Sequence, residues 1–165
     1  MRRRLTPLRD RHAGGRSTRG VAAVELALLL MPLVLITFGA TEIGRAIYTY
    51  NTLDKTVRDA TRYLSQHGSG DVTVQNQAAC LAVYGNTTCT APALAPGLTV
   101  SNVSVCDPVA CPATHQGVAT GLGTVNLVSI SIGAPATAYT FSSLVSFVFP
   151  SLNFNSISCT MRAQL

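Results

Sequence analysis

Hydrophobic and polar positions divide this chain into three parts, and the first is an apolar run. The run extends from Val21 to Ala40, and Glu25 is its only charged residue. About 20 predominantly apolar residues are enough for a helix to cross a bilayer. The pattern therefore predicts a transmembrane helix over residues 21–42. It argues against a cleaved secretory signal, whose apolar region is shorter, about 7–15 residues.

Beyond this run, apolar residues recur every three or four positions, which is the period of an amphipathic helix. Charged residues of both signs lie between them, and Gly68 and Gly70 end the pattern. We therefore expect the helix to continue as an amphipathic extension over residues 43–66. Its apolar stripe is a candidate contact surface and consists of Ile43, Ile47, Tyr50, Leu53, Val57, Ala60 and Leu64.

The third part, residues 71–165, is poor in charge and rich in glycine, proline, serine, threonine and asparagine. Two stretches, 98–105 and 125–132, alternate between apolar and polar residues, which is typical of half-buried strands. Further candidates are strands at 147–149 and 157–161, a short helix at 77–84, and a stretch at 138–149 that is compatible with either. These elements predict an α+β fold, with a small antiparallel sheet packed on the outer part of the long helix.

Charge is concentrated at the N-terminus. Residues 1–20 hold seven arginines and one aspartate, so they carry +6, and the remainder of the chain sums to −1, which gives the net +5. A nucleic-acid surface needs basic residues on the folded part, so we expect no nucleic-acid partner. Residues 1–20 instead form a basic leader that precedes the span. The positive-inside rule then places the N-terminus in the cytoplasm and residues 45–165 outside it, including the outer domain of residues 71–165.

The cysteines agree with this orientation, because all five lie beyond the predicted span, where disulfides persist. The close spacings suggest the pairs Cys80–Cys89 and Cys106–Cys111, which would leave Cys159 over, although spacing alone does not fix the connectivity. A metal site is the weaker alternative, since the chain lacks a C-x-x-C motif. We expect no cofactor.

Glu25 is the most informative single residue. A carboxylate at membrane depth costs roughly 2–3 kcal/mol on the translocon scales, so an intramembrane glutamate is a functional hypothesis by default. It lies at the fifth position after Gly20, in the sequence Gly20-Val-Ala-Ala-Val-Glu25. An alternative is that Glu25 lies near the cytoplasmic helix end and extends its carboxylate to the membrane surface.

A glycine, four residues and a glutamate at the head of a membrane helix is the pattern of a class III signal sequence, as in type IV pilins. Over residues 19–64 the chain resembles the TadE-like family, the pilin-like proteins of tight-adherence (Flp) pilus assembly. The residues that carry this resemblance are Arg19-Gly20, Ala22 to Ala27, Pro32, Phe38-Gly39 to Glu42, and Arg58 to Tyr63.

The resemblance implies a pilin-like fold and a set of partners. A prepilin peptidase would cut between Gly20 and Val21, and Glu25 would then help to admit the subunit to an assembly by neutralising a neighbour's α-amino group. The other partners would be pilin-like subunits and the pilus assembly platform in the inner membrane of a bacterium. The outer domain is too large for a major Flp subunit, which favours a minor, pseudopilin role.

Two classes of function remain open. The first is this pilin-like role, with the outer domain in the periplasm or outside the cell. The alternative is an unprocessed, single-span membrane protein with an extracytoplasmic binding domain. We do not expect an enzyme: Asp71 and Asp107 lie beside turn-forming residues, and the outer domain offers few other charges from which to build a catalytic site.

Overall fold

The computed structural model describes residues 19–164 and divides the chain into two compact units, Met1–Ile36 and Thr37–Leu165. Helix α1 (Arg19–Ser65) begins in the first unit and continues into the second. Apart from Arg19 and Gly20, the predicted leader lies outside the described residues. In the first unit we therefore describe only the first part of α1, and all else below concerns the second.

Within the second unit, α1 has the amphipathic character that the sequence predicts. Buried apolar residues recur on one side, and polar residues occupy the others. Threonines on the helix donate their hydroxyl hydrogen bonds back to carbonyl oxygens of the preceding turn, as Thr61 does to Val57 at 2.7 Å. An exposed ion pair joins Arg58 to Asp54, one turn earlier. The helix ends at Ser65, one residue before the predicted end.

A three-stranded antiparallel sheet faces this helix. It consists of β1 (Val103–Cys106), β4 (Leu127–Ile132) and β7 (Ile157–Arg162), in the order β1-β4-β7. The central strand β4 alternates strictly, with Val128, Ile130 and Ile132 buried and the residues between them half-buried. This period of two is the reason that the sequence predicted a strand here.

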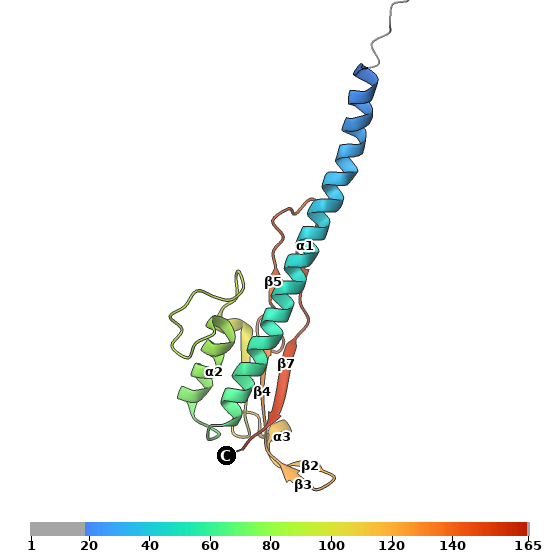
Figure 1. Ribbon diagram of the computed structural model, residues 1–165. Helices are drawn as coiled ribbons and strands as arrows, with labels where there is room; N and C mark the ends of the chain where they lie inside the picture. The colour runs from blue at the N-terminus through green and yellow to red at the C-terminus, as the bar shows by residue number, and fades with distance from the viewer. Residues whose placement is uncertain (1–18, 165) are drawn as a thin grey trace, which may run out of the picture. The chain divides into compact units, whose positions relative to one another are not determined.

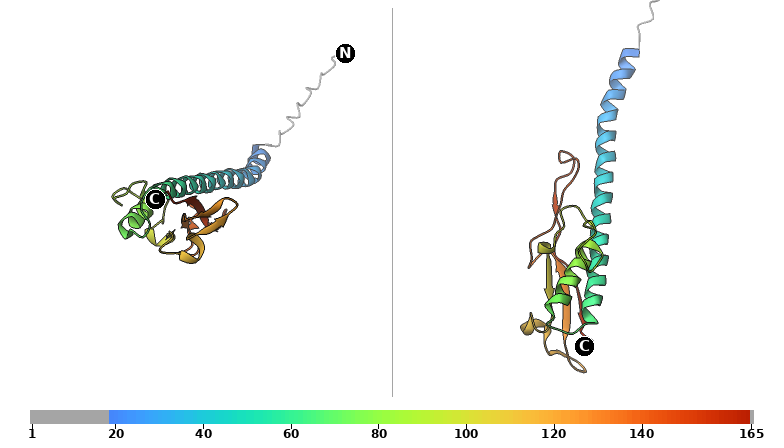
Figure 2. Two further views of the ribbon diagram at one scale, coloured as in Figure 1. Left: turned by 90° about the horizontal axis from the view of Figure 1, so that it is seen from below. Right: turned by 90° about the vertical axis from the view of Figure 1, so that its left-hand side faces the viewer.

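Helix α2 (Val72–Tyr84) completes the core. Figure 1 and the right panel of Figure 2 both show it beside α1. The buried apolar cluster combines residues of both helices with those of the sheet, among them Leu53, Ala78 and Ile130. The Asp71 carboxylate accepts the backbone N–H groups of Thr73 and Val74 and so caps the first turn of α2. The sequence placed Asp71 only beside a turn, and the structure shows that it caps a helix.

The remaining elements are short. They are the 3-10 turn η1 (Val100–Asn102), α3 (Pro112–His115), the hairpin of β2 (Val118–Thr120) and β3 (Gly123–Val125), and the pair β5 (Thr140–Phe141) and β6 (Leu152–Asn153). Both two-stranded pairings are antiparallel. The α+β fold with a long helix packed on small antiparallel sheets is therefore confirmed.

Several boundaries differ from prediction. The strand expected over 98–105 begins only at Val103, because the buried Asn102 side chain accepts hydrogen bonds from Thr99 and closes a 3-10 turn. The strand expected over 147–149 is wrong: the N–H groups of Val148 and Phe149 both donate to the Val145 carbonyl, which forms a turn. Helix α2 starts five residues before the predicted 77, since its β-branched first turn resembles a strand in sequence.

Candidate functional site

The first candidate feature is the apolar part of α1. Among the described residues it is the one helix that is long and apolar enough to cross a membrane, with none of its most apolar window buried. Fully burying a leucine side chain is worth about 1.5–3 kcal/mol relative to leaving it in water. Many exposed leucines, valines and isoleucines in succession therefore require a lipid or protein environment. Together with the disulfide-bonded outer domain, this helix indicates membrane anchoring with an extracytoplasmic domain.

The predicted processing and assembly residues all lie at the start of α1. Gly20, Val21 and Glu25 are exposed. The space around Gly20 is open, since a Cβ atom placed there would meet no atom within 4 Å. Among residues 19–164, ion pairs join Arg45 to Glu42 and Arg58 to Asp54, and Glu25 takes part in neither. Its carboxylate is thus open to a group from another molecule.

The predicted contact stripe of α1 divides into two parts. Its last four residues belong to the chain's own core, where the exposed fraction is at most 2%; they are Leu53, Val57, Ala60 and Leu64. Its first three, Ile43, Ile47 and Tyr50, keep 47%, 57% and 46% of their surface exposed. The stripe is therefore no single lateral surface, because α2 and the sheet already cover its C-terminal part.

The exposed part of the stripe borders an apolar groove, which we call the apolar flank. Its volume is about 260 Å³, and it is lined by Ile43, Ala46, Ile47, Tyr50, Phe149, Leu152 and Phe154. Tyr50 and Phe154 meet edge to face, with ring centroids 5.7 Å apart. The residues Phe149 to Phe154 come from the segment around β6, so the fold brings two distant parts of the sequence together here.

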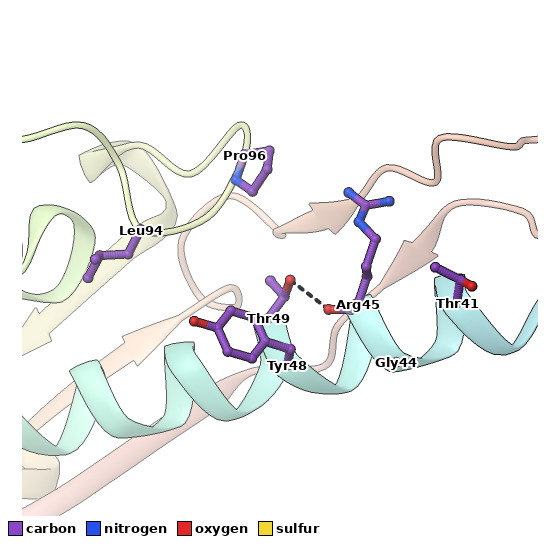
Figure 3. Close-up of a pocket in the computed structure, with 7 residues that line it drawn as sticks. All are labelled: Thr41, Gly44, Arg45, Tyr48, Thr49, Leu94 and Pro96. Atoms are coloured by element: carbon purple, nitrogen blue, oxygen red, sulfur yellow. Dashed lines mark hydrogen bonds between the residues drawn. The ribbon is translucent and has the colours of Figure 1, made fainter. Parts of the chain in front are cut away.

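Another side of α1 carries a more polar groove (Figure 3). Its volume is about 440 Å³, and its lining comes from α1 and from the loop that holds Leu94 and Pro96. A second groove of about 490 Å³ shares Tyr48 and Leu94 with it and continues along α1 past Lys55 and Asp59. Within the second unit, α1 therefore presents one apolar and one polar flank.

Glu42, which is buried, and Arg45, which is half-buried, form an ion pair that the sequence did not predict. Glu42 is only 2% exposed, and both of its carboxylate oxygens accept from Arg45 Nη1, at 3.0 and 2.9 Å. The Arg45 guanidinium also lies over the Phe141 ring, 5.4 Å from the centroid. The i, i+3 spacing of opposite charges was a usable signal for the pair, but no local pattern indicates the contact with Phe141 in β5.

Two disulfides, Cys80–Cys89 and Cys106–Cys111, constrain the outer domain, and Cys159 is free and half-buried in β7. The first ties α2 to the following loop, and the second ties the end of β1 to the start of α3. His115 lies with the second pair in a cluster whose potential metal-ligand atoms are all within 4.8 Å of one another. Zinc binds cysteine as a thiolate, however, and these sulfurs are bonded to each other. The His115 Nε2 atom is 2.7 Å from Ser129 Oγ.

Asp107 organises the turn after β1 and has no catalytic partner among the groups that contact it. It is 1% exposed, and its carboxylate accepts hydrogen bonds from Val109 N, Ala110 N and Gly70 N and from the Gln75 side chain. Burial by itself would raise the pKa of this carboxyl group, but the four donors stabilise the charged form and hold the pKa below the usual 3.8. Asp107 thus links β1 to α2.

Comparison with known proteins identifies the first part of the chain. The family model for TadE-like protein matches residues 20–62, so this segment is a TadE-like domain. Such a domain implies a pilin-like protein of tight-adherence pilus assembly, associated with the assembly machinery and generally without enzymatic activity. A search of curated proteins found no match, and a search of solved structures also found none. The outer domain beyond residue 62 lies outside the matched segment.

Proposed function

We propose that this chain is a minor pilin-like membrane protein, or pseudopilin, in the assembly of a tight-adherence pilus. Residues 21–42 span the inner membrane of a bacterium, the N-terminus is cytoplasmic, and residues 71–165 form a domain in the periplasm or outside the cell. The TadE-like domain supports the pilin-like role. The exposed apolar helix and the two disulfides support this topology.

The observation that carries the proposal is that Glu25 lacks an ion-pair partner among residues 19–164. Its carboxylate lies in the apolar part of α1 and takes part in neither of the two ion pairs found among residues 19–164. A lone charge in hydrocarbon is costly, and pairing with an opposite charge lowers that cost. Cleavage after Gly20 would create such a charge, the α-amino group of Val21. The Glu25 of one subunit would then pair with the Val21 amine of its neighbour.

The apolar flank supplies a second contact in this proposal. Ile43, Ile47 and Tyr50 lie just beyond the span and remain about half exposed beside the core. A helix of a neighbouring pilin-like subunit, held parallel in the same membrane, would bury these side chains. Catalysis has no part in this proposal, because Asp71 caps α2 and Asp107 accepts hydrogen bonds within the fold.

The experiment is intact mass measurement and N-terminal sequencing of the membrane-extracted protein, in cells with and without the prepilin peptidase. We expect a chain that begins at Val21 only when the peptidase is present. Gly20→Val should block this processing, because a branched side chain would obstruct the backbone at the cleaved bond. Gly44→Ala is the matched control, since Gly44 is also an exposed helical glycine with open space around it.

An uncut chain in both strains would overturn the cleavage claim. Glu25 would then be an interfacial residue, and the protein would fit the alternative of an unprocessed, anchored extracytoplasmic binding domain. Processing of the Gly20→Val variant at the normal rate would show that the cut occurs elsewhere.

A further inference from the structure

The segment between β5 and β6 exposes apolar side chains that do not pack into the core of the domain. It reads Ser-Ser-Leu-Val-Ser-Phe-Val-Phe-Pro-Ser over residues 142–151. Phe147 is 82% exposed and Leu144 78% exposed, which in this unit places them with Leu122 among the most exposed large apolar residues. A turn closed by hydrogen bonds to the Val145 carbonyl presents them. We call residues 142–151 the β5–β6 loop.

Contacts fix where this loop lies along α1. The Val148 Cγ1 atom is 3.9 Å from the position of a Cβ atom on Gly39, and Phe149 lines the apolar flank with Ile43. Figure 1 and the right panel of Figure 2 both show the loop alongside α1, at the opposite end of the domain from the β2–β3 hairpin. Gly39 is the penultimate residue of the apolar run Val21 to Ala40. The loop therefore meets the helix where its membrane-capable segment ends.

The composition of the loop suits a bilayer interface. Neither the loop nor any other residue between Asp107 and Arg162 is an aspartate, glutamate, lysine or arginine, so insertion would bury no formal charge of these types. The exposed serines, Ser142, Ser146 and Ser151, can bind lipid headgroups, while the exposed Leu144 and Phe147 side chains favour the acyl boundary. An apolar patch that is exposed in water and lies beside a membrane segment is a candidate for membrane contact.

We propose that the β5–β6 loop inserts Leu144 and Phe147 into the headgroup–acyl boundary of the outer leaflet, next to α1. The occupant of this surface is phospholipid, because Leu144 and Phe147 are exposed, the loop contains no aspartate, glutamate, lysine or arginine, and Val148 meets α1 at Gly39, near the end of the apolar run. The inference rests on the membrane anchoring of α1 in the proposed function. A second attachment point beside the helix would restrict the tilt and rotation of the outer domain relative to the membrane, and so determine which way the apolar flank faces.

The test uses tryptophan fluorescence, since the native chain contains no tryptophan. The full chain carrying Phe147→Trp would be reconstituted into phosphatidylethanolamine/phosphatidylglycerol vesicles containing lipids brominated near the headgroup or deep in the acyl chain. Leu122→Trp is the matched control, because Leu122 is fully exposed between β2 and β3 at the other end of the domain. Leu30→Trp, in the middle of the apolar run, reports whether the helix itself is inserted.

We expect bromolipid to quench Phe147→Trp several times more strongly than Leu122→Trp, with shallow bromines more effective than deep ones. Leu30→Trp should show the opposite depth preference. Quenching of Leu30→Trp but not of Phe147→Trp would overturn the loop proposal alone. Blue-shifted but unquenched emission from Phe147→Trp would also overturn it, because a protein would then cover the loop. An unquenched Leu30→Trp would remove the membrane anchoring and the loop proposal with it.

Discussion

Two glutamates on the same helix have contrasting surroundings. Glu25 lies in the apolar part of α1 and is exposed, and it belongs to neither ion pair within residues 19–164. Glu42 is 2% exposed, and Arg45 neutralises it one turn later on the same helix. In the proposed function the first carboxylate pairs with a neighbouring subunit, whereas Arg45 of the same helix already satisfies the second.

The contact stripe shows the same division. Its last four residues are enclosed by the chain's own α2 and sheet, while Ile43, Ile47 and Tyr50 remain exposed. Replacing residues whose side chains are already buried or paired within the domain should therefore lower its stability. Replacing exposed residues that have no such contacts should reduce assembly and leave the stability of the domain unchanged. The predictions below test this division, beginning with the variant that is expected to abolish assembly.

Glu25→Leu should abolish assembly without unfolding the domain. Loss of a pairing worth about 2–3 kcal/mol in hydrocarbon corresponds to a roughly 30- to 150-fold loss in association. Co-purification of the variant with other pilin-like subunits measures the first effect, and denaturant unfolding of the outer domain measures the second. Normal co-purification would show that Glu25 has no pairing role and merely reaches the membrane surface.

Leu53→Ala should destabilise the outer domain by about 2–5 kcal/mol, because it removes a fully buried side chain and leaves a cavity between α1 and the sheet. Ile47→Ala, on the same stripe but 57% exposed, should change stability by less than about 0.5 kcal/mol. Urea unfolding of the full chain in detergent compares the two. Equal destabilisation would show that the first part of the stripe is also packed within the chain.

The sequence predicted some parts of the fold and of the candidate site but not others. Periodicity predicted the long helix and strand β4. Buried apolar residues recur every three or four positions from Leu53 to Leu64, and every second position from Val128 to Ile132. It failed where a side chain overrides the backbone preference, as Asn102 does by closing a turn. It gave Glu25 as a candidate from spacing, but the apolar flank combines α1 with Phe149 and Phe154, residues that only the tertiary fold brings together.

Asp107 extends the comparison to a carboxylate held by hydrogen-bond donors alone. Because its pKa is lowered in the folded state, it contributes stability above its unfolded pKa of about 3.8 and loses that contribution as pH falls through the folded pKa. Asp107→Asn should cost about 1–3 kcal/mol at neutral pH, since the amide turns a donor towards Gly70 N or the Gln75 side chain. The variant should also lose the part of the pH dependence that lies below about pH 3.8.

Asp71→Asn is the matched control for this prediction, because asparagine is as good an N-cap as aspartate. It should leave α2 and the stability at neutral pH almost unchanged. Urea midpoints measured between pH 2 and pH 7 distinguish the two variants. If Asp107→Asn kept the full acid dependence of the wild type, another carboxyl group would be responsible for it.

Glu42→Gln should have the smallest of these effects, about 1–2 kcal/mol, because the new amide oxygen would still accept one hydrogen bond from Arg45, whose side chain is 33% exposed. Asp54→Asn is the matched control: it breaks the more exposed pair with Arg58 on the same helix and should cost no more than about 0.5 kcal/mol. Unfolding in urea at low and high salt tests both variants. Salt should weaken the Asp54–Arg58 pair more than the Glu42–Arg45 pair, because screening acts mainly on exposed charges.

One outcome would remove the contrast between the two glutamates. If Glu42→Gln left the domain stable but reduced its co-purification with pilin-like subunits, Glu42 would, like Glu25, be a group that pairs with another subunit.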